Sequence, residues 1–323
     1  MRRVLLWLGA AAVAGLVTAP AAAADGPLST IQGGAGVASH AHPGLHYVTV
    51  SDGARGTLLE RIDFAHWTVF SWLRVAGTWG IPTVGNAYLS GEGLSRDGRT
   101  LVLGSTSGPY ASPSKFLVVD PTRMKVVRTI VLHGSFTFDA LSPDGSRLYL
   151  IEYTRGTSDL THYIVRAFDM RTNRLVAGKI ADRREHEESM AGYAMTRTTS
   201  ADGRWVYTLY QKPNGEPFVH ALDTVGAAAY CIDLPKNRGL YNIVLSLRNG
   251  GRTLSAHWRS GRPWIDVATG TWSISYPRSG FPWAWVGGGI GGGLALLVAG
   301  ALLLRRRRGE KLEQRSRQEL GLA

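Results

Sequence analysis

Apolar β-forming residues alternate with polar ones on both sides of an Asp-Gly pair at several places along this chain. The copies are Leu94–Leu103, Leu141–Leu150 and Thr199–Tyr207, with a fourth, Ser246–Leu254, that has Asn-Gly-Gly instead. Asp-Gly between such runs predicts a tight β-hairpin, because glycine adopts the positive φ that the turn requires. Asp97, Asp144 and Asp202 recur at the same place in the repeat, so we interpret them as turn-forming rather than catalytic residues.

Each hairpin is followed by a second pair of strand-like runs. Phe116–Asp120 turns into Val126-Val127, and Val165–Asp169 turns into Leu175-Val176. Val219–Asp223 and Trp264–Asp266 begin weaker equivalents. The repeating unit is therefore strand, turn, strand, loop, strand, turn, strand, and four strands repeated radially form the blades of a β-propeller.

The spacing of the repeats agrees with this interpretation. The turn glycines Gly98, Gly145, Gly203 and Gly251 are separated by 47, 58 and 48 residues, near the roughly 40–50 residues of propeller repeats. The longer interval places about nine extra residues in segment 181–189, a loop length that blades otherwise lack.

These motifs resemble those of the YVTN-type and WD-repeat-like propellers that are common in bacterial extracytoplasmic proteins. The resemblance covers residues 90–276 and implies a fold, whereas propellers host binding proteins and enzymes alike. We expect an all-β fold in which residues 45–276 form a β-propeller ectodomain of five to six four-stranded blades, seven being harder to accommodate. Leu45–Ser90 is expected to supply a divergent blade and the strand that closes the ring.

The N-terminus has the features of a secretory signal peptide, predicted for residues 1–24. Arg2 and Arg3 precede an apolar run from Val4 to Val17, and small residues lead to Asp25. The run is too short for a membrane span, which needs roughly 20 apolar residues. Residues 25–44 are predicted to be a flexible N-terminal segment.

A second apolar segment, Trp283–Leu304, has 22 residues without a charge and is followed directly by four arginines. It predicts a C-terminal transmembrane helix with its basic end in the cytoplasm. The sequence therefore predicts a single-pass type I protein of the plasma membrane with an extracellular ectodomain. Residues 277–282 form the linker, and residues 305–323 form a basic cytoplasmic tail.

Two further interpretations of this C-terminal region stay open. Glycines 287–289 stand four residues before glycines 291–293, a spacing that permits a homodimer through the glycine-rich transmembrane helix. Tyr276–Gly280 resembles a sortase sorting signal but has Tyr and Ser where that motif has Leu and Thr. A protein attached to the cell wall by a sortase is therefore one alternative.

Composition changes this picture in two ways. The formal charge is +12, but half of the excess lies in the two terminal segments, so the charge is no argument for nucleic-acid binding. Cys231 is the one cysteine of the chain, so the ectodomain has no internal disulfide and depends on its core for stability. Cys231 lies in an apolar run and is interpreted as an inert thiol.

The blade order places two long loops of one blade, Thr154–His162 and Ala181–Gly192, on the same face as neighbours, together with Ser105–Ser114. Loops on a rigid scaffold are where binding usually occurs. We therefore expect an envelope protein or a small ligand to bind on this loop face. The candidate binding residues are Arg155, Asp159, His162, Arg183, Arg184, Glu185, His186, Glu187 and Glu188.

Motifs for catalysis are weak. Gly104–Gly108 has Thr106 where a nucleophile elbow has serine, and His40, His42 and His46 form a spacing that suits a metal but fall in a glycine-bearing segment. We therefore expect no enzyme, no cofactor and no metal, and a membrane-tethered binding or assembly module of the bacterial cell envelope. A propeller hydrolase or lactonase-like enzyme is the alternative, and it requires clustered acids or histidines in the central channel.

Overall fold

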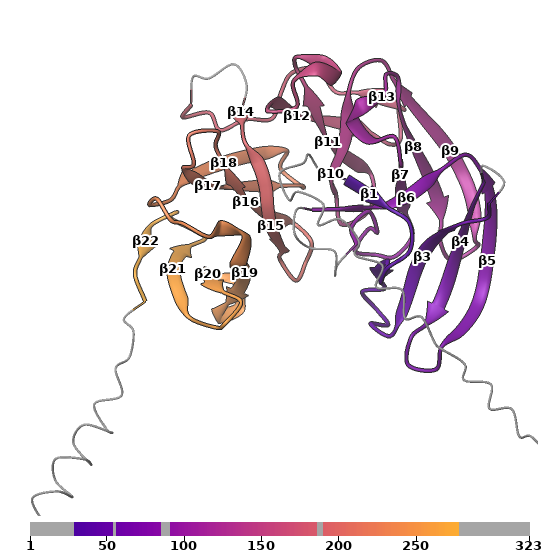
Figure 1. Cartoon of the computed structure of the whole chain (residues 1–323), viewed down its shortest axis with the longest axis horizontal. Coiled ribbons are helices and arrows are strands. Elements are labelled where there is room, and N and C mark those ends of the chain that lie inside the picture. Colours follow the sequence, from indigo (N-terminus) through magenta and orange to yellow (C-terminus); the bar gives the residue numbers. More distant parts are fainter. Residues whose placement is uncertain (1–28, 54–55, 85–90, 186–189, 278–323) are drawn as a thin grey trace, which may run out of the picture. The chain divides into compact units, whose positions relative to one another are not determined.

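The computed structural model describes residues 29–53, 56–84, 91–185 and 190–277. The chain up to Ser275 is one compact unit, and its described residues form five antiparallel sheets that follow one another in chain order (Figure 1). The segments predicted to be a signal peptide, a transmembrane helix and a basic tail, and nearly all of the predicted linker, lie outside the described residues. Among the described residues, no helix is long and apolar enough to span a membrane.

The sheets are numbered here by their place in the chain. The first sheet has β2 (Val37–Ala38), β3 (Leu45–Ser51), β4 (Gly56–Asp63) and β5 (Thr68–Ala76). The second has β1 (Ser29–Ile31), β6 (Trp79–Thr83), β7 (Leu101–Ser105), β8 (Ser114–Asp120) and β9 (Lys125–Leu132). The third has β10 (Phe136–Leu141), β11 (Arg147–Tyr153), β12 (His162–Asp169), β13 (Arg174–Leu175) and β14 (Met190–Ala191).

The last two sheets have four strands each. The fourth sheet has β15 (Tyr193–Thr199), β16 (Trp205–Gln211), β17 (Pro217–Asp223) and β18 (Ala228–Asp233). The fifth has β19 (Ile243–Arg248), β20 (Thr253–Trp258), β21 (Pro263–Ala268) and β22 (Ile274–Ser275). Four 3₁₀ turns lie between strands: η1 (Gly108–Tyr110), η2 (Gly156–Ser158), η3 (Leu240–Asn242) and η4 (Asn249–Gly251). Consecutive antiparallel strands in sheets of four to five confirm the predicted propeller-blade unit, at the lower end of the expected number.

The predicted Asp-Gly turns have one hydrogen-bond pattern in three sheets. In the third sheet, the Ser142 hydroxyl donates to Asp144 at 2.7 Å and accepts from the Arg147 amide at 2.9 Å. The Asp144 carboxylate accepts from the Ser146 amide at 3.0 Å, and Gly145 has a φ of 69°. Ser95–Asp97 and Ser200–Asp202 repeat these contacts. The aspartates therefore organise turns, as the sequence predicts.

Each sheet also has a left-handed residue in the turn that follows β4, β8, β12, β17 or β21. These residues are Trp67, Met124, Asn173, Ala227 and Trp272, with φ between 48° and 59°. In three sheets an aspartate at the end of the strand before this turn accepts two of the turn's backbone amides: Asp120, Asp169 and Asp223. The backbone cost of the left-handed residue is thus partly offset by hydrogen bonds that close the turn.

The N-terminal part differs from the sequence-based expectations in two respects. Strands β1 and β2 fall within residues 25–44, which we expected to be a flexible segment. The described strands of Leu45–Ser90, which we expected to include the one that closes the ring, all pair within the first two sheets, and β1 pairs with β6 in the second sheet. The reason lies in Gly80 and Gly104, because a Cβ at either position would meet Thr30 or Ile31 of β1 within 2.6 Å.

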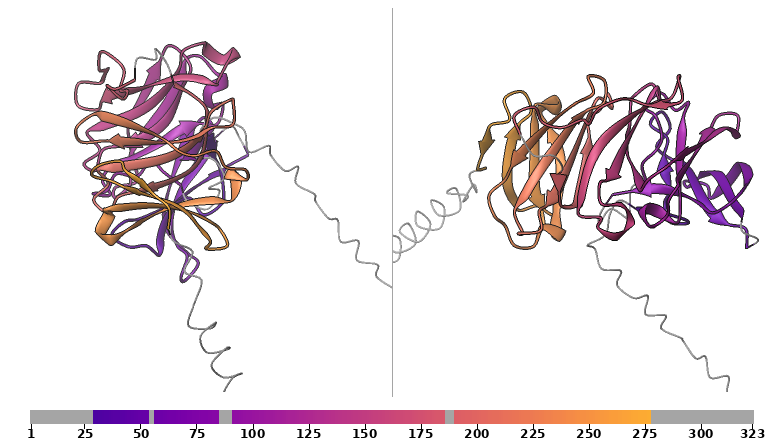
Figure 2. Two further views of the ribbon diagram at one scale, coloured as in Figure 1. Left: turned by 90° about the vertical axis from the view of Figure 1, so that its left-hand side faces the viewer. Right: turned by 90° about the horizontal axis from the view of Figure 1, so that it is seen from above.

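Four hydrophobic clusters join the sheets in chain order, as the face-to-face packing in Figure 2 illustrates. Tyr47 and Leu59 pack on Leu101 between the first two sheets. Phe116 packs with Phe138, Tyr163 with Tyr210, and Leu209 with Leu245 across the next three boundaries. Within the described residues, no such cluster joins the fifth sheet to the first. Stability therefore comes from neighbouring sheets in sequence rather than from closure of a ring.

Candidate functional site

The loop face contains the two loops that the sequence analysis singled out, and the structure places them side by side. Strand β14 pairs with β12 so that Ala191 lies opposite His162 and Met190 opposite Tyr163 (Figure 1). The Gly192 amide donates to the Thr161 carbonyl at 3.1 Å. Turns η1 and η2 also contact each other, so the Ser105–Ser114 loop continues the same surface. We call residues 154–162 and 181–192 the paired loops.

Asp159 organises the first paired loop. Its carboxylate accepts from Arg155 Nη1 at 2.8 Å, lies 3.1 Å from His162 Nδ1, and accepts from the hydroxyl and the amide of Thr161. These contacts, those of Thr161 first, hold the pKa of Asp159 well below its ordinary value. The predicted residues Arg155, Asp159 and His162 are therefore brought together, and Arg155 stays exposed at the surface.

Asp182 organises the second paired loop, and the sequence analysis did not include it. Its carboxylate is buried and receives Arg184 in a bidentate contact, Nε at 2.9 Å and Nη2 at 2.5 Å. It also accepts the Cys231 amide at 2.8 Å, while Arg184 donates to the Cys231 carbonyl at 3.1 Å. Burial opposes the ionised form, but Arg184 and the amides outweigh it and lower the pKa of Asp182 to about 2.

The predicted binding residues of this loop thus differ in their exposure and in the groups that they contact. Arg184 is committed to Asp182 and lies over the Tyr230 ring at 5.6 Å, so it holds the loop in place. Arg183 and Glu185 are exposed. His186, Glu187 and Glu188 lie outside the described residues.

A hollow of about 270 Å³ lies beside the paired loops, next to strands β14, β17 and β18. Met190, Pro213 and Phe218 give it an apolar lining, and Glu185, Lys212 and Asp233 give it charged groups. Lys212 contacts Asp233 at 2.9 Å and lies over the Phe218 ring at 5.4 Å. An apolar centre with charges around it suits an apolar side chain of a partner.

Cys231 also lines this hollow, but its thiol is chemically quiet. Burial, and then the neighbouring Glu185, raises its pKa well above the ordinary value, so the thiol is protonated at neutral pH. Asp182, Glu185 and Cys231 place their ligand atoms within 4.8 Å of one another. This group fits a guanidinium rather than a metal ion, because Arg184 and a backbone amide already occupy the Asp182 carboxylate.

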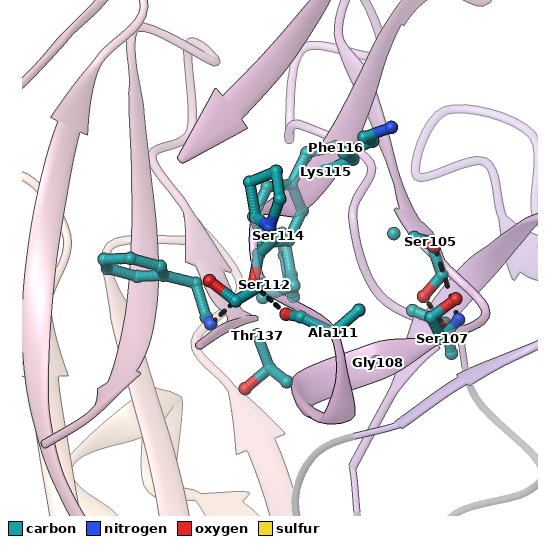
Figure 3. A pocket seen from close by; sticks show the side chains of 14 residues that line it. Ser105, Ser107, Gly108, Ala111, Ser112, Ser114, Lys115, Phe116 and Thr137 are labelled. Atoms are coloured by element: carbon teal, nitrogen blue, oxygen red, sulfur yellow. Dashed lines mark hydrogen bonds between the residues drawn. The ribbon is translucent and has the colours of Figure 1, made fainter. Parts of the chain in front are cut away.

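A second hollow of about 270 Å³ lies between β7, β8 and β10 on the same face. Figure 3 shows Ser112, Ser114 and Ala111 on one side of it and Ser105 and Ser107 on the other. Ser114 Oγ donates to the Gly134 carbonyl at 3.0 Å and accepts from the Phe136 amide at 2.8 Å. Its lining has hydroxyls, aromatic rings and Lys115 but no carboxylate or imidazole, so it offers hydrogen bonds to a neutral polar group.

The three histidines of the N-terminal cluster do not converge in the structure. His40 Nδ1 lies 3.0 Å from Arg96, whereas His46 Nδ1 lies 2.7 Å from the Ala35 carbonyl. His42 is exposed. Their spacing in the sequence therefore does not correspond to a metal site among the described residues.

Comparison with known proteins is informative at the level of fold. No protein-family model and no curated protein sequence matches the chain. Among solved structures, the chain is similar to hydrazine synthase of Kuenenia stuttgartiensis, with 18% identity, a TM-score of 0.43 and coverage of 68% of this chain and 59% of that one. It is similar to the dihydro-heme d1 dehydrogenase NirN, with 17% identity, a TM-score of 0.44 and coverage of 72% and 43%.

The chain is also similar to the β-propeller domain of Cps50 (Swd1) from Myceliophteria thermophila, with 14% identity and a TM-score of 0.42. The match covers 71% of this chain and 64% of that one. The chain thus spans between 43% and 64% of the length of these structures. The resemblance to β-propellers that the sequence indicated is confirmed, whereas the YVTN type stays a prediction. A propeller is a common scaffold for protein binding and for enzymes.

One expectation from the sequence is corrected by these comparisons. We expected a protein that is not an enzyme, but two of the structures to which the chain is similar are named as a synthase and a dehydrogenase. The propeller fold therefore does not support the exclusion of enzymes. The similarity concerns the fold alone, since all three identities are below 20%.

Proposed function

We propose that this chain is an exported, membrane-tethered β-propeller of the bacterial cell envelope that binds a partner protein through the paired loops. The observation that carries the proposal is the pairing of β14 with β12, which joins two long loops into one surface. Asp159 and Asp182 each fix one of these loops from within. Preorganised loops lose little conformational entropy on binding, so they favour a specific partner.

The charges of this surface support a protein as the partner. Arg155 and Arg183 are exposed on the paired loops, and Glu185 of the second loop lines the hollow together with Met190 and Phe218. Exposed arginines and apolar hollows are each typical of protein interfaces, where arginine and buried apolar side chains contribute most to binding. The export and tether rest on residues 1–24 and 283–304 of the sequence, with their basic flanks.

The test is affinity purification of the tagged full-length protein from membranes of the native cell after crosslinking. We expect the protein in the membrane fraction together with a partner that the double variant Arg155→Ala, Arg183→Ala recovers about tenfold less well. Arg99→Ala is the matched control, because Arg99 is an exposed arginine on an Asp-Gly turn, away from the paired loops. Equal recovery with the double variant would exclude the paired loops as the interface, and recovery in the soluble fraction would contradict the tether.

A further inference from the structure

A third pocket lies where the Asp-Gly turns of the second, third and fourth sheets meet. The Asp97 amide donates to the Pro143 carbonyl at 3.1 Å. A Cβ on Gly203 would lie 3.2 Å from Arg96 Cβ. These turns surround a cavity of about 250 Å³, which we call the turn-side pocket. Its lining includes Glu92, Arg96, His40, Phe138, Pro143 and Val206.

Glu92 provides an acidic group in this pocket that has no protein partner. Its side chain is half-buried, and its carboxyl makes no hydrogen bond or ion pair with any described residue. Burial raises the pKa of Glu92, an effect that Arg197 opposes and Asp139 reinforces. Burial therefore outweighs the support that Arg197 gives to the ionised carboxyl.

Arg197, the positive charge next to Glu92, is committed to other partners. Arg197 is buried, and it donates from Nη2 to Asp139 Oδ1 at 2.5 Å and from Nε to Thr208 Oγ1 at 2.8 Å. Asp139 is also buried, and its second carboxylate oxygen, Oδ2, has no hydrogen-bond partner. Glu92, Asp139 and Arg197 interact electrostatically, so two acids share one committed arginine. Of these three residues Glu92 alone lines the turn-side pocket, and no described donor forms a hydrogen bond with its carboxyl.

Arg96 provides the opposite charge at the rim. It is exposed, and no described carboxylate forms an ion pair with it. Its Nη1 lies 3.0 Å from His40 Nδ1. Burial and the Arg96 charge lower the pKa of His40, so the neutral imidazole accepts this hydrogen bond. The turn-side pocket is thus lined by Arg96 and by Glu92, neither of which forms an ion pair with a described residue.

We propose that the turn-side pocket binds a small zwitterionic amino acid, whose ammonium group contacts Glu92 and whose carboxylate contacts Arg96. Phe138, Pro143 and Val206 offer an apolar wall to its side chain. Opposite charges at two places in one cavity select a ligand with both charges over a ligand with one, because each unpaired group costs desolvation. The inference concerns a different pocket from the paired loops and stands without the proposed partner.

The experiment is isothermal titration of the detergent-solubilised full-length protein with glycine, L-alanine and L-leucine, and with methylammonium and acetate as single-charge probes. We expect at least one amino acid to bind about tenfold more tightly than either single-charge probe. Glu92→Gln and Arg96→Gln should each weaken that binding about tenfold. Arg99→Gln, three residues from Arg96 and outside the pocket lining, should leave it unchanged.

The Arg96→Gln variant should fold normally, because Arg96 is exposed and its replacement leaves the buried Asp139–Arg197 pair intact. Weaker binding by this variant therefore reports on the pocket and not on unfolding. Three results would overturn the proposal. They are no binding of any of the three amino acids at millimolar concentration, equal binding of methylammonium or acetate, and unchanged binding by the folded Arg96→Gln variant.

Discussion

Glycines at the Asp-Gly turns differ in what surrounds them, although they share one backbone conformation. Gly98 and Gly145 have φ values of 71° and 69°. An added Cβ at Gly98 would meet nothing within 4 Å, whereas at Gly145 it would lie 2.5 Å from Thr100 Oγ1 of the neighbouring turn. The first glycine thus serves the turn alone, and the second also lets two sheets approach each other.

Alanine substitution separates these two contributions. Gly98→Ala should lower the free energy of unfolding by about 1–2 kcal/mol, the cost of a left-handed alanine. Gly145→Ala should lower it by a further 1 kcal/mol or more, roughly, because Thr100 has to move. Urea denaturation of both variants measures the difference, and equal losses would contradict the contact between the turns of the second and third sheets.

At the scale of elements, Asp182 connects a loop to a strand. It holds the 181–185 segment against β18 through the Cys231 amide and through Arg184. Because the pKa of Asp182 is lowered to about 2, this stabilisation is complete above its ordinary pKa of about 4. It is lost only as the pH falls through about 2. The loop is therefore held at neutral and at mildly acidic pH.

Cys231 reports on this connection, because it is the one cysteine of the chain. Asp182→Asn should make the Cys231 thiol react roughly tenfold faster with a disulfide reagent at pH 8, since the loop that covers it opens more often. Asp233→Asn is the control, because Asp233 is exposed and pairs with Lys212 beside the same hollow. Similar rates for both variants would show that Asp182 does not hold the loop.

At the scale of the whole molecule, one buried ion pair links two sheets near the turn-side pocket. Asp139 belongs to β10 and Arg197 to β15, and both side chains are at most 3% exposed. Strand β10 has a register shift at Asp139, between Phe138 and Ala140, and β15 has one between Ala194 and Thr196. The bulge in β10 falls on Asp139 itself, and the one in β15 lies two residues before Arg197, so both strands are irregular close to the ion pair.

Breaking this pair should be far more costly than breaking a surface pair. Asp139→Asn should lower the free energy of unfolding by about 3–5 kcal/mol, because Arg197 would stay buried without its counter-charge. The double variant Asp139→Leu, Arg197→Met should recover most of that loss. Arg123→Ala, which removes an exposed pair with Asp120, should cost less than about 1 kcal/mol. Urea unfolding tests all three, and a cost for Asp139→Asn as small as for Arg123→Ala would refute the role of the pair.

The repeats in the sequence determined the blade, its turns and the position of the paired loops. Asp-Gly turns and alternating apolar runs act locally, so their spacing predicts the strand order and places loops 154–162 and 181–192 on one face. The same strand order placed Arg155, Arg183 and Asp159 on this face, where the two arginines are exposed and Asp159 contacts Arg155.

Only the tertiary structure decided which distant side chains meet. Asp182 lies 49 residues from Cys231, and Arg197 lies 58 residues from Asp139, so no local pattern links them. The same holds for β1, which reaches the second sheet because two glycines of that sheet leave room for it. The period of a repeat determines the strands of a blade, whereas contacts between blades depend on bulges, side-chain volumes and buried charge, which pack in three dimensions.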